Sequence, residues 1–336
     1  MENRKELLGF LEEDIDMIIQ EAKQAAMQYV RERLALSFEN ILWEEAQKRI
    51  KGVALQNDEL LNHDPVTNQE KKKIYLFGIT GADAEGYISQ SNLEGMVYED
   101  RVYPVIHKDL AAVVCQVTEE EFNEFKMQEL IENRDWWEEK IERHKKVLSL
   151  LAKDYPVIPM RFSSLYPCHH QLRLFMEENY RDLMDLLNKI RDKTEWGLKL
   201  FLNVDKFKMF LQEKDESINN LIDEVSLNQT GKGYFPQKRL ANRIESKAFD
   251  LAEEVHRRLC RFSQGAVLNK LIRKNDHEKR EQMILNGAYL VEQTQEEEFL
   301  QVVKWLEETE GEKGFIFKIS GPRPCYNFCH ISSTGT

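Results

Sequence analysis

Two clusters in this sequence have the residue types that could bind a metal ion. Residues 168–170 read Cys-His-His, and residues 325–330 contain a Cys-x3-Cys-His group. A zinc site needs three or four such ligands in one place, so the two distant clusters would have to meet. We expect instead that they are incidental surface residues, and that the protein holds no metal and no other cofactor.

A second set of polar side chains lies on the charged stretch of residues 136–148 and on the apolar run that follows it. Glu138, Arg143 and His144 belong to the stretch, and Arg161 ends the run Pro156–Met160. A histidine on an apolar helix face is more often a hydrogen-bonded core residue than a base or a ligand. We therefore predict a buried polar network here. The alternative is a cytoplasmic α+β enzyme with an unrecognised polar site around His144 and Arg161.

The glycine-rich stretches do not match phosphate-binding loops. Gly78, Gly81 and Gly86 lack the G-x-G-x-x-G spacing, and residues 228–233 lack the complete Walker string. An enzyme also needs a nucleophile with a base, paired carboxylates or a metal, and no such set occurs at a recognisable spacing. The sequence thus predicts a protein that is not an enzyme.

The composition restricts the partners and the compartment. The 336 residues carry a net charge of -12, which disfavours nucleic acids and anionic membranes. No apolar run reaches the roughly 18 residues that span a bilayer, and the N-terminus lacks a signal peptide. The 5 cysteines are an odd number, as expected for free thiols in a reducing cytoplasm.

The first 70 residues form an acidic extension. They contain 15 acidic and 8 basic residues, a net charge of -7, and residues 10–51 include no Gly or Pro. Apolar residues recur at steps of three or four, which predicts an amphipathic helix or helical hairpin followed by a linker. Such a helix either packs on its own core or serves as an arm for partners or for self-association through residues 7–42.

The next segment, residues 71–193, has the pattern of an α+β domain. We expect strands over 74–79, 102–106, 110–115 and 157–162, the last of them at a sheet edge because prolines bracket it. We expect one helix that starts after a Thr118 cap and runs to about residue 153, and another over 171–192.

From Trp196 the pattern restarts and gives the order β–α–β–β–α–β over residues 194–331, which is the ferredoxin-like arrangement. Thr294 is expected to cap its last helix, and Ser-Gly-Pro-Arg-Pro to end a closing strand over 315–319. Residues 313–319 resemble part of an RNA-binding RNP1 string. However, they lie on the fourth strand rather than the third, and no basic stripe flanks them.

Five stretches together resemble the gas vesicle protein family GvpL/GvpF. Each alone is weak, but their order and spacing match the family over residues 74–329. The closing stretch is the most specific of them. The stretches are residues 74–79 (IYLFGI), 143–148 (RHKKVL), 156–162 (PVIPMRF), 285–291 (LNGAYLV) and 320–328 (SGPRPCYNF).

The resemblance implies a two-domain, non-enzymatic accessory protein of gas vesicle assembly, cytoplasmic or vesicle-associated. It also implies that the protein contacts the shell protein GvpA and other accessory Gvp proteins. Arg323 and Cys325 stand where the family usually has Trp and Pro, and Ser163-Ser164 replaces Gly-Thr. These departures affect partner contacts rather than the fold, and we add Arg323, Tyr326 and Phe328 to the candidate residues. The expected contact surfaces are the edge strand 157–162 and the helix 7–42.

Overall fold

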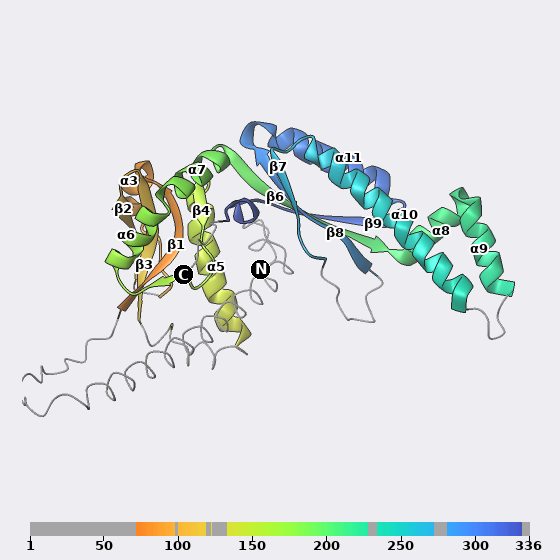
Figure 1. The fold of residues 1–336 in the computed structure, drawn as a ribbon, viewed down its shortest axis with the longest axis horizontal. Coiled ribbons are helices and arrows are strands. Elements are labelled where there is room, and N and C mark those ends of the chain that lie inside the picture. Colours follow the sequence, from red (N-terminus) through yellow and green to blue (C-terminus); the bar gives the residue numbers. More distant parts are fainter. Residues whose placement is uncertain are drawn as a thin grey trace, which may run out of the picture. The chain divides into compact units, whose positions relative to one another are not determined.

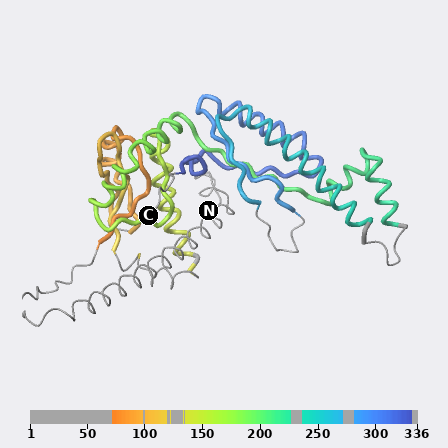
Figure 2. The backbone as a smooth tube through the Cα atoms, viewed as in Figure 1, coloured from red at the N-terminus to blue at the C-terminus, as the bar shows by residue number. Residues whose placement is uncertain are grey.

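The computed structural model describes residues 72–97, 100–118, 122, 133–227, 234–271 and 281–330. The helical extension predicted over residues 1–70 lies outside these ranges. The described chain divides between Met184 and Asp185 into two compact units, and Figure 2 traces the backbone of each. The predicted domain boundary at residue 193 stays a prediction.

The N-terminal unit is built on an antiparallel sheet with β1 (Lys72–Gly81) near its centre. On one side β1 pairs with β3 (Leu110–Thr118), which pairs in turn with β2 (Tyr103–His107). The short strands β4 (Val157–Pro159) and β5 (Leu165–Tyr166) also pair with β1. Residues 74–80 of β1 are all buried, which explains why this part of its sequence is a nearly continuous apolar run rather than an alternating one.

Helices complete this unit, and two of them correct the sequence prediction. Helix α5 spans Arg134–Leu151, and the Asn133 side chain accepts a hydrogen bond from its first turn. Thr118 is the last residue of β3, and the stretch predicted to continue from it lies mostly outside the described residues. A short helix, α3 (Glu85–Gln90), follows the glycine-rich turn, where no helix was predicted.

The single helix predicted over 171–192 is two helices, α6 (His169–Glu178) and α7 (Tyr180–Ile190). Asn179 separates them with a non-helical backbone. Its side-chain amide donates to the carbonyl of Phe175 at 2.8 Å. Local bonds of this kind compete with helix continuation, which a pattern of apolar residues does not reveal.

The C-terminal unit is a four-stranded antiparallel sheet in the order β7-β8-β6-β9. Three helices lie between its first two strands in the chain, and one between the last two. The elements are β6 (Lys193–Asn203), α8 (Val204–Lys214), α9 (Glu216–Leu227), α10 (Tyr234–Cys260), β7 (Gly265–Leu268), β8 (Glu281–Glu292), α11 (Glu296–Gly311) and β9 (Phe315–Arg323).

The core of this unit lies on one face of the sheet. Figure 1 shows α10 and α11 running side by side along that face. Alternate residues of β6 point into it, from Trp196 to Leu202, and they pack with buried side chains of α8, α9, α10 and α11. The period of two along β6 is what places one set of side chains in this core and the other set on the opposite face.

Two predictions for this unit are wrong. The closing strand does not stop at Ile319, because β9 runs through Ser320, Gly321 and Pro322 and ends at Arg323, directly before Pro324, with a register shift opposite β6 between Glu195 and Gly197. Proline is tolerated because β9 is an edge strand, where one side of the backbone needs no ladder bond. Thr294 does not cap α11, since it lies inside a 3-10 turn, Gln293–Gln295, and Gln295 precedes the helix.

Within the described residues, no helix is both long enough and apolar enough to cross a membrane.

Candidate functional site

His144 is the centre of a buried hydrogen-bonded cluster in the N-terminal unit. Its Nε2 lies 3.1 Å from the carbonyl oxygen of Met160, so Nε2 carries the proton and donates. Its Nδ1 accepts from the hydroxyl of Tyr75 at 2.9 Å, and that hydroxyl accepts from the N–H of Ser163 at 3.3 Å. Burial lowers the pKa of His144 to about 3. The imidazole is therefore neutral and saturated with partners, which suits a structural role.

The same region explains three of the five sequence stretches that stood out. Gly78 of β1 lies where an added Cβ would come within 2.8 Å of both the Ile158 carbonyl oxygen and a Leu148 methyl group. Helix α5 and strand β4 therefore both pack directly against β1 at this glycine. Together with the bonds of His144, this contact ties the first three stretches into one packed unit.

The other members of the predicted network are not buried with His144. Arg161 is exposed, and Glu138 and Arg143 are half-buried. Arg143 donates to Glu139 Oε1 at 3.0 Å and to the Gly95 carbonyl at 3.4 Å, which fastens α5 to the loop before β2. The structure therefore corrects the prediction of one buried network of four residues.

Glu195 is the centre of a second buried cluster, in the C-terminal unit. Its carboxylate accepts from Arg323 Nε at 2.9 Å, from the Asn327 N–H at 2.7 Å and from the Asn327 side-chain amide at 2.6 Å. Glu195 has 0% exposure, and the Arg323 side chain only 9%. Gly197 leaves room for this cluster, since an added Cβ would lie 2.7 Å from Ser320 Oγ and from the Arg323 guanidinium. The closing sequence is thereby anchored to β6.

The candidate residues Tyr326 and Phe328 lie in the short turn after β9. Burial raises the pKa of Tyr326 well above its usual value, so the phenol stays neutral. Phe328 is buried, and the Lys189 ammonium donates to its carbonyl at 3.1 Å and lies 5.9 Å from its ring centroid. Together with Arg323, these residues fold the closing segment onto the sheet, and an interaction role for them stays a prediction.

Sequence reasoning missed Glu195, Asn327 and Tyr75. Glu195 carried a signal, because an acid in the first positions of an otherwise apolar strand needs a buried partner. Asn327 lay within the stretch already singled out. Tyr75 gave no signal, because tyrosine is an ordinary residue in a buried strand.

A groove of about 620 Å³ lies beside β7, the edge strand of the C-terminal sheet. Gly265, Ala266 and Val267 form one wall, and Lys189 and Lys193 are among the residues that complete it. Leu268, the last residue of β7, is 58% exposed. The site thus combines a strand edge, an exposed apolar side chain and positive charge in an acidic protein.

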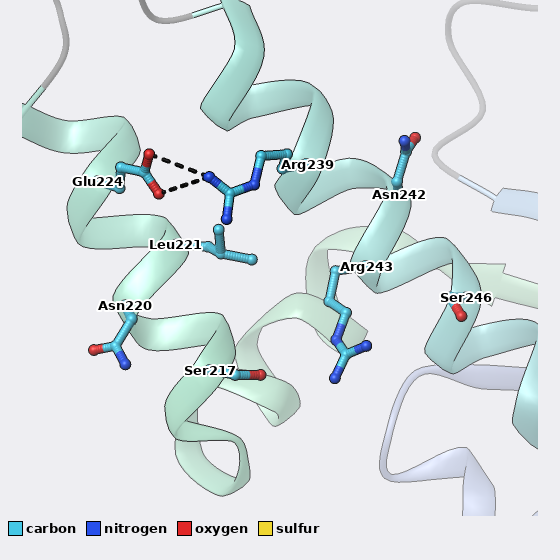
Figure 3. A pocket seen from close by; sticks show the side chains of 8 residues that line it. All are labelled: Ser217, Asn220, Leu221, Glu224, Arg239, Asn242, Arg243 and Ser246. Atoms are coloured by element: carbon cyan, nitrogen blue, oxygen red, sulfur yellow. Dashed lines mark hydrogen bonds and ion pairs between the residues drawn. The ribbon is translucent and has the colours of Figure 1, made fainter.

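A second groove, of about 630 Å³, lies between α9 and α10 (Figure 3). Arg239 pairs with Glu224 across it at 3.4 Å, and Arg243 extends into the space between the helices. Both members of the ion pair are substantially exposed. We assign no ligand to this groove, since an exposed pair of this kind is usually a solvated surface feature.

The described part of the chain contains no group of three or more His, Cys, Asp or Glu side chains that could hold a metal ion. Cys168 is exposed, whereas Cys325 is buried. Burial raises the pKa of the Cys329 thiol to about 12.

Comparison with known proteins agrees with this architecture. Residues 73–330 match the family model described as gas vesicle synthesis protein GvpL/GvpF. Gas vesicle protein L of Streptomyces sp. (strain CB03234) is 23% identical over 230 residues, which cover 67% of this chain and 82% of that protein.

Two crystal structures share the fold. GvpF from Anabaena sp. PCC7120 aligns with a TM-score of 0.61 and 16% identity, over 78% of this chain and 99% of that one. GvpF from Microcystis aeruginosa aligns with a TM-score of 0.57 and 17% identity, over 77% and 99% of the two chains. The match of the family model covers more than half of the sequence, and it includes every helix and strand that builds the two clusters. The chain therefore belongs to the GvpL/GvpF family of gas vesicle proteins.

Proposed function

We propose that this protein is a non-enzymatic accessory protein of gas vesicle assembly. In this role it binds the shell protein GvpA, other accessory Gvp proteins, or both during nucleation and growth of the vesicle, in the cytoplasm and in association with vesicles. The observation that carries the proposal is the family match over residues 73–330. Its two polar clusters support a scaffold rather than a catalyst, because their groups are buried and bonded to one another.

The enzyme alternative around His144 and Arg161 has lost its support. A general base must be able to take up a proton near the working pH and must reach a substrate. Burial lowers the pKa of His144 to about 3, both of its nitrogens are hydrogen-bonded, and Arg161 lies on the surface.

We further assign the C-terminal unit to the ferredoxin-like class. Its four strands are antiparallel and lie in the order second, third, first, fourth, with the core helices on one face. This order is the one that a β–α–β–β–α–β chain gives when each crossover is right-handed. The domain limits 71–193 and 194–331 are proposed on the same grounds, with residues 1–70 as a helical extension.

The partner surface that we favour is the edge of β7. The sequence pointed to the edge strand near residues 157–162, but β4 has only three residues and all of them are buried. Directly after β7, the N–H of Asn269 donates to the carbonyl of Asn286 in β8 at 2.8 Å. Bonded positions alternate along an antiparallel pair, so Ala266 and Leu268 turn their backbone N–H groups away from β8.

A shell subunit that polymerises must expose strand edges and apolar surface before it assembles. If an edge strand of the shell subunit paired with β7, both the strand edge and the apolar surface of that subunit would be covered. The exposed Leu268 would supply an apolar contact. The groove and its lysines would accept the side chains of the added strand.

The test is co-purification of untagged GvpA with the tagged full-length chain. We expect the wild type to capture GvpA or another Gvp protein, and Leu268→Glu and Ala266→Pro to lower the capture by about tenfold or more. Met209→Glu is the matched control, because Met209 is 66% exposed on another element of the same unit. Equal losses in Leu268→Glu and Met209→Glu would reject the surface, and no capture by the wild type would reject the function.

A further inference from the structure

The groove beside β7 is basic, although the protein as a whole has a net charge of -12. Its lining includes Lys189, Lys193 and His330 and no Asp or Glu. Within the part of the chain that the structure describes, both ammonium groups bond to backbone carbonyls rather than to acids. Lys189 donates to Phe328 at 3.1 Å, and Lys193 donates to Arg191 at 3.3 Å. An ammonium group has three N–H donors, so each lysine keeps donors for a bound group.

The nearby buried acid does not neutralise these lysines. Glu195 follows Lys193 in the same strand, but its carboxylate accepts from Arg323 and from Asn327. The positive charge of the groove is therefore left for a partner.

The rest of the lining is largely apolar and belongs to the sheet face opposite the core. Ala266 packs against the core, so the period of two along β7 turns Gly265 and Val267 to the other face. There a ring carbon of Phe328 lies 3.3 Å from the position that a Cβ of Gly265 would take. Leu186 and Leu290 complete the apolar lining. The groove thus joins an apolar surface to two ammonium groups.

We propose that this groove binds an extended acidic segment of a partner protein, in which a carboxylate and an apolar side chain lie on the same face of the strand. The inference rests on the proposed role of the β7 edge and adds the chemistry of the segment that pairs with it. A strand beside β7 turns alternate side chains to one face, so those opposite Gly265 and Val267 would enter the groove. The carboxylate would accept from Lys189 or Lys193, and the apolar side chain would pack on Phe328.

The mixed lining disfavours a segment of only one kind. A wholly apolar segment would remove water from both ammonium groups without supplying an anion, which costs free energy. A wholly charged segment would leave the apolar part of the groove in contact with water and lose the gain from its burial.

A second copy of this chain does not offer such a segment from its described sheets. The strands at the sheet edges are β2, β4, β7 and β9, and none of them contains Asp or Glu. Pairing of two copies through these edges would therefore leave the lysines of the groove without a carboxylate. The partner segment that fits is one from a different protein.

Short peptides without any Gvp sequence test this chemistry directly. The reference peptide is acetyl-Thr-Val-Thr-Glu-Thr-Val-Thr-amide, whose valines and glutamate share one strand face. In three relatives, glutamine replaces the glutamate, lysine replaces the glutamate, or serine replaces both valines. Each peptide is titrated into the full-length chain with labelled Leu and Val methyl groups. The methyl resonances of Val267 and Leu290 then report binding in the groove and give its Kd.

We expect the reference peptide to bind about tenfold more tightly than the glutamine peptide, and more tightly than the lysine and serine peptides. Lys189→Gln with Lys193→Gln should abolish the preference for glutamate, whereas Lys189→Arg with Lys193→Arg should keep it. The matched control is Lys238→Gln with Lys304→Gln. It changes the net charge equally, at exposed lysines of α10 and α11 in the same unit, and should keep the preference.

Four results would overturn the proposal. They are no binding of the reference peptide, equal affinity for the glutamate and glutamine peptides, an equal loss in the control variant, and tighter binding of a single-stranded oligonucleotide of similar length. The last result would assign the lysines to nucleic acid. Capture of GvpA is a separate measurement. Its failure with the glutamate preference intact would reject the proposed function alone, and capture without that preference would reject only the inference about the groove.

Discussion

Substitution of Glu195 is the sharpest perturbation of the C-terminal unit. The carboxylate is fully buried and accepts three hydrogen bonds, one from Arg323 and two from Asn327. These donors lie 128 and 132 residues away in the chain, so one side chain joins the first strand of the unit to its closing segment. Glu195→Ala removes all three bonds and leaves the largely buried guanidinium of Arg323 without this carboxylate.

The expected loss is large. Removal of one member of a buried ion pair costs about 3–5 kcal/mol, because the other charge remains in a poorly solvated place. Glu195→Gln keeps the shape and one acceptor oxygen, and we expect it to cost about 2 kcal/mol. For a unit of this size, a loss of about 3–5 kcal/mol corresponds to a fall in Tm of roughly 6–20 °C.

Hydrogen exchange of the full-length chain in increasing urea measures this loss locally, in peptides of β6 and β9, without assuming that the two units unfold together. Glu297→Gln is the control, because Glu297 is an exposed acid on α11 and its substitution should change the free energy of unfolding by less than about 0.5 kcal/mol. A cost below about 1 kcal/mol for Glu195→Ala would refute the view that this cluster holds the closing segment.

Three further predictions concern the N-terminal unit. Gly78→Ala should lower its stability by about 1–3 kcal/mol, since the new methyl group would lie 2.8 Å from the Ile158 carbonyl oxygen. In thermal unfolding Gly86→Ala should not destabilise, because it lies in helix α3 and its new methyl group meets nothing within 4 Å. Tyr75→Phe removes the donor to His144 and should cost about 1–3 kcal/mol in urea unfolding; an unchanged midpoint would contradict the hydrogen bond. The pKa of His144 falls from 6.5 to about 3 on folding, so between these values the unfolded chain binds the proton and the folded chain does not. Stability is therefore full above about pH 6.5 and falls by up to about 1.4 kcal/mol per pH unit below it, and His144→Gln should remove that part of the slope in a pH series of urea titrations.

Much of the fold could be predicted from the sequence wherever burial of one face imposes a regular spacing of apolar residues. The apolar run of β1 and the alternation along β6 predicted the central strand of each sheet correctly. A strand inside a sheet must place apolar side chains on each face that is buried, and this requirement is visible in its sequence. The stripe of α10 gave its helix for the same reason.

Other features depend on contacts that are distant in the chain. Whether Pro322 ends a strand depends on the position of β9 at the sheet edge, which no local pattern encodes. The break at Asn179 depends on a single side-chain bond. Arg161 was expected in one network with His144, yet the hydrogen-bond partners of His144 are Tyr75 and a backbone carbonyl.

We propose that this protein assists gas vesicle assembly through the edge of β7. The most direct test is vesicle formation in a host that carries a complete gas vesicle gene cluster from which only this gene has been removed. We expect few or no vesicles by electron microscopy without the gene, recovery with the wild type and with Met209→Glu, and no recovery with Leu268→Glu. Normal vesicle numbers without the gene would contradict the function, and full recovery with Leu268→Glu would contradict the surface.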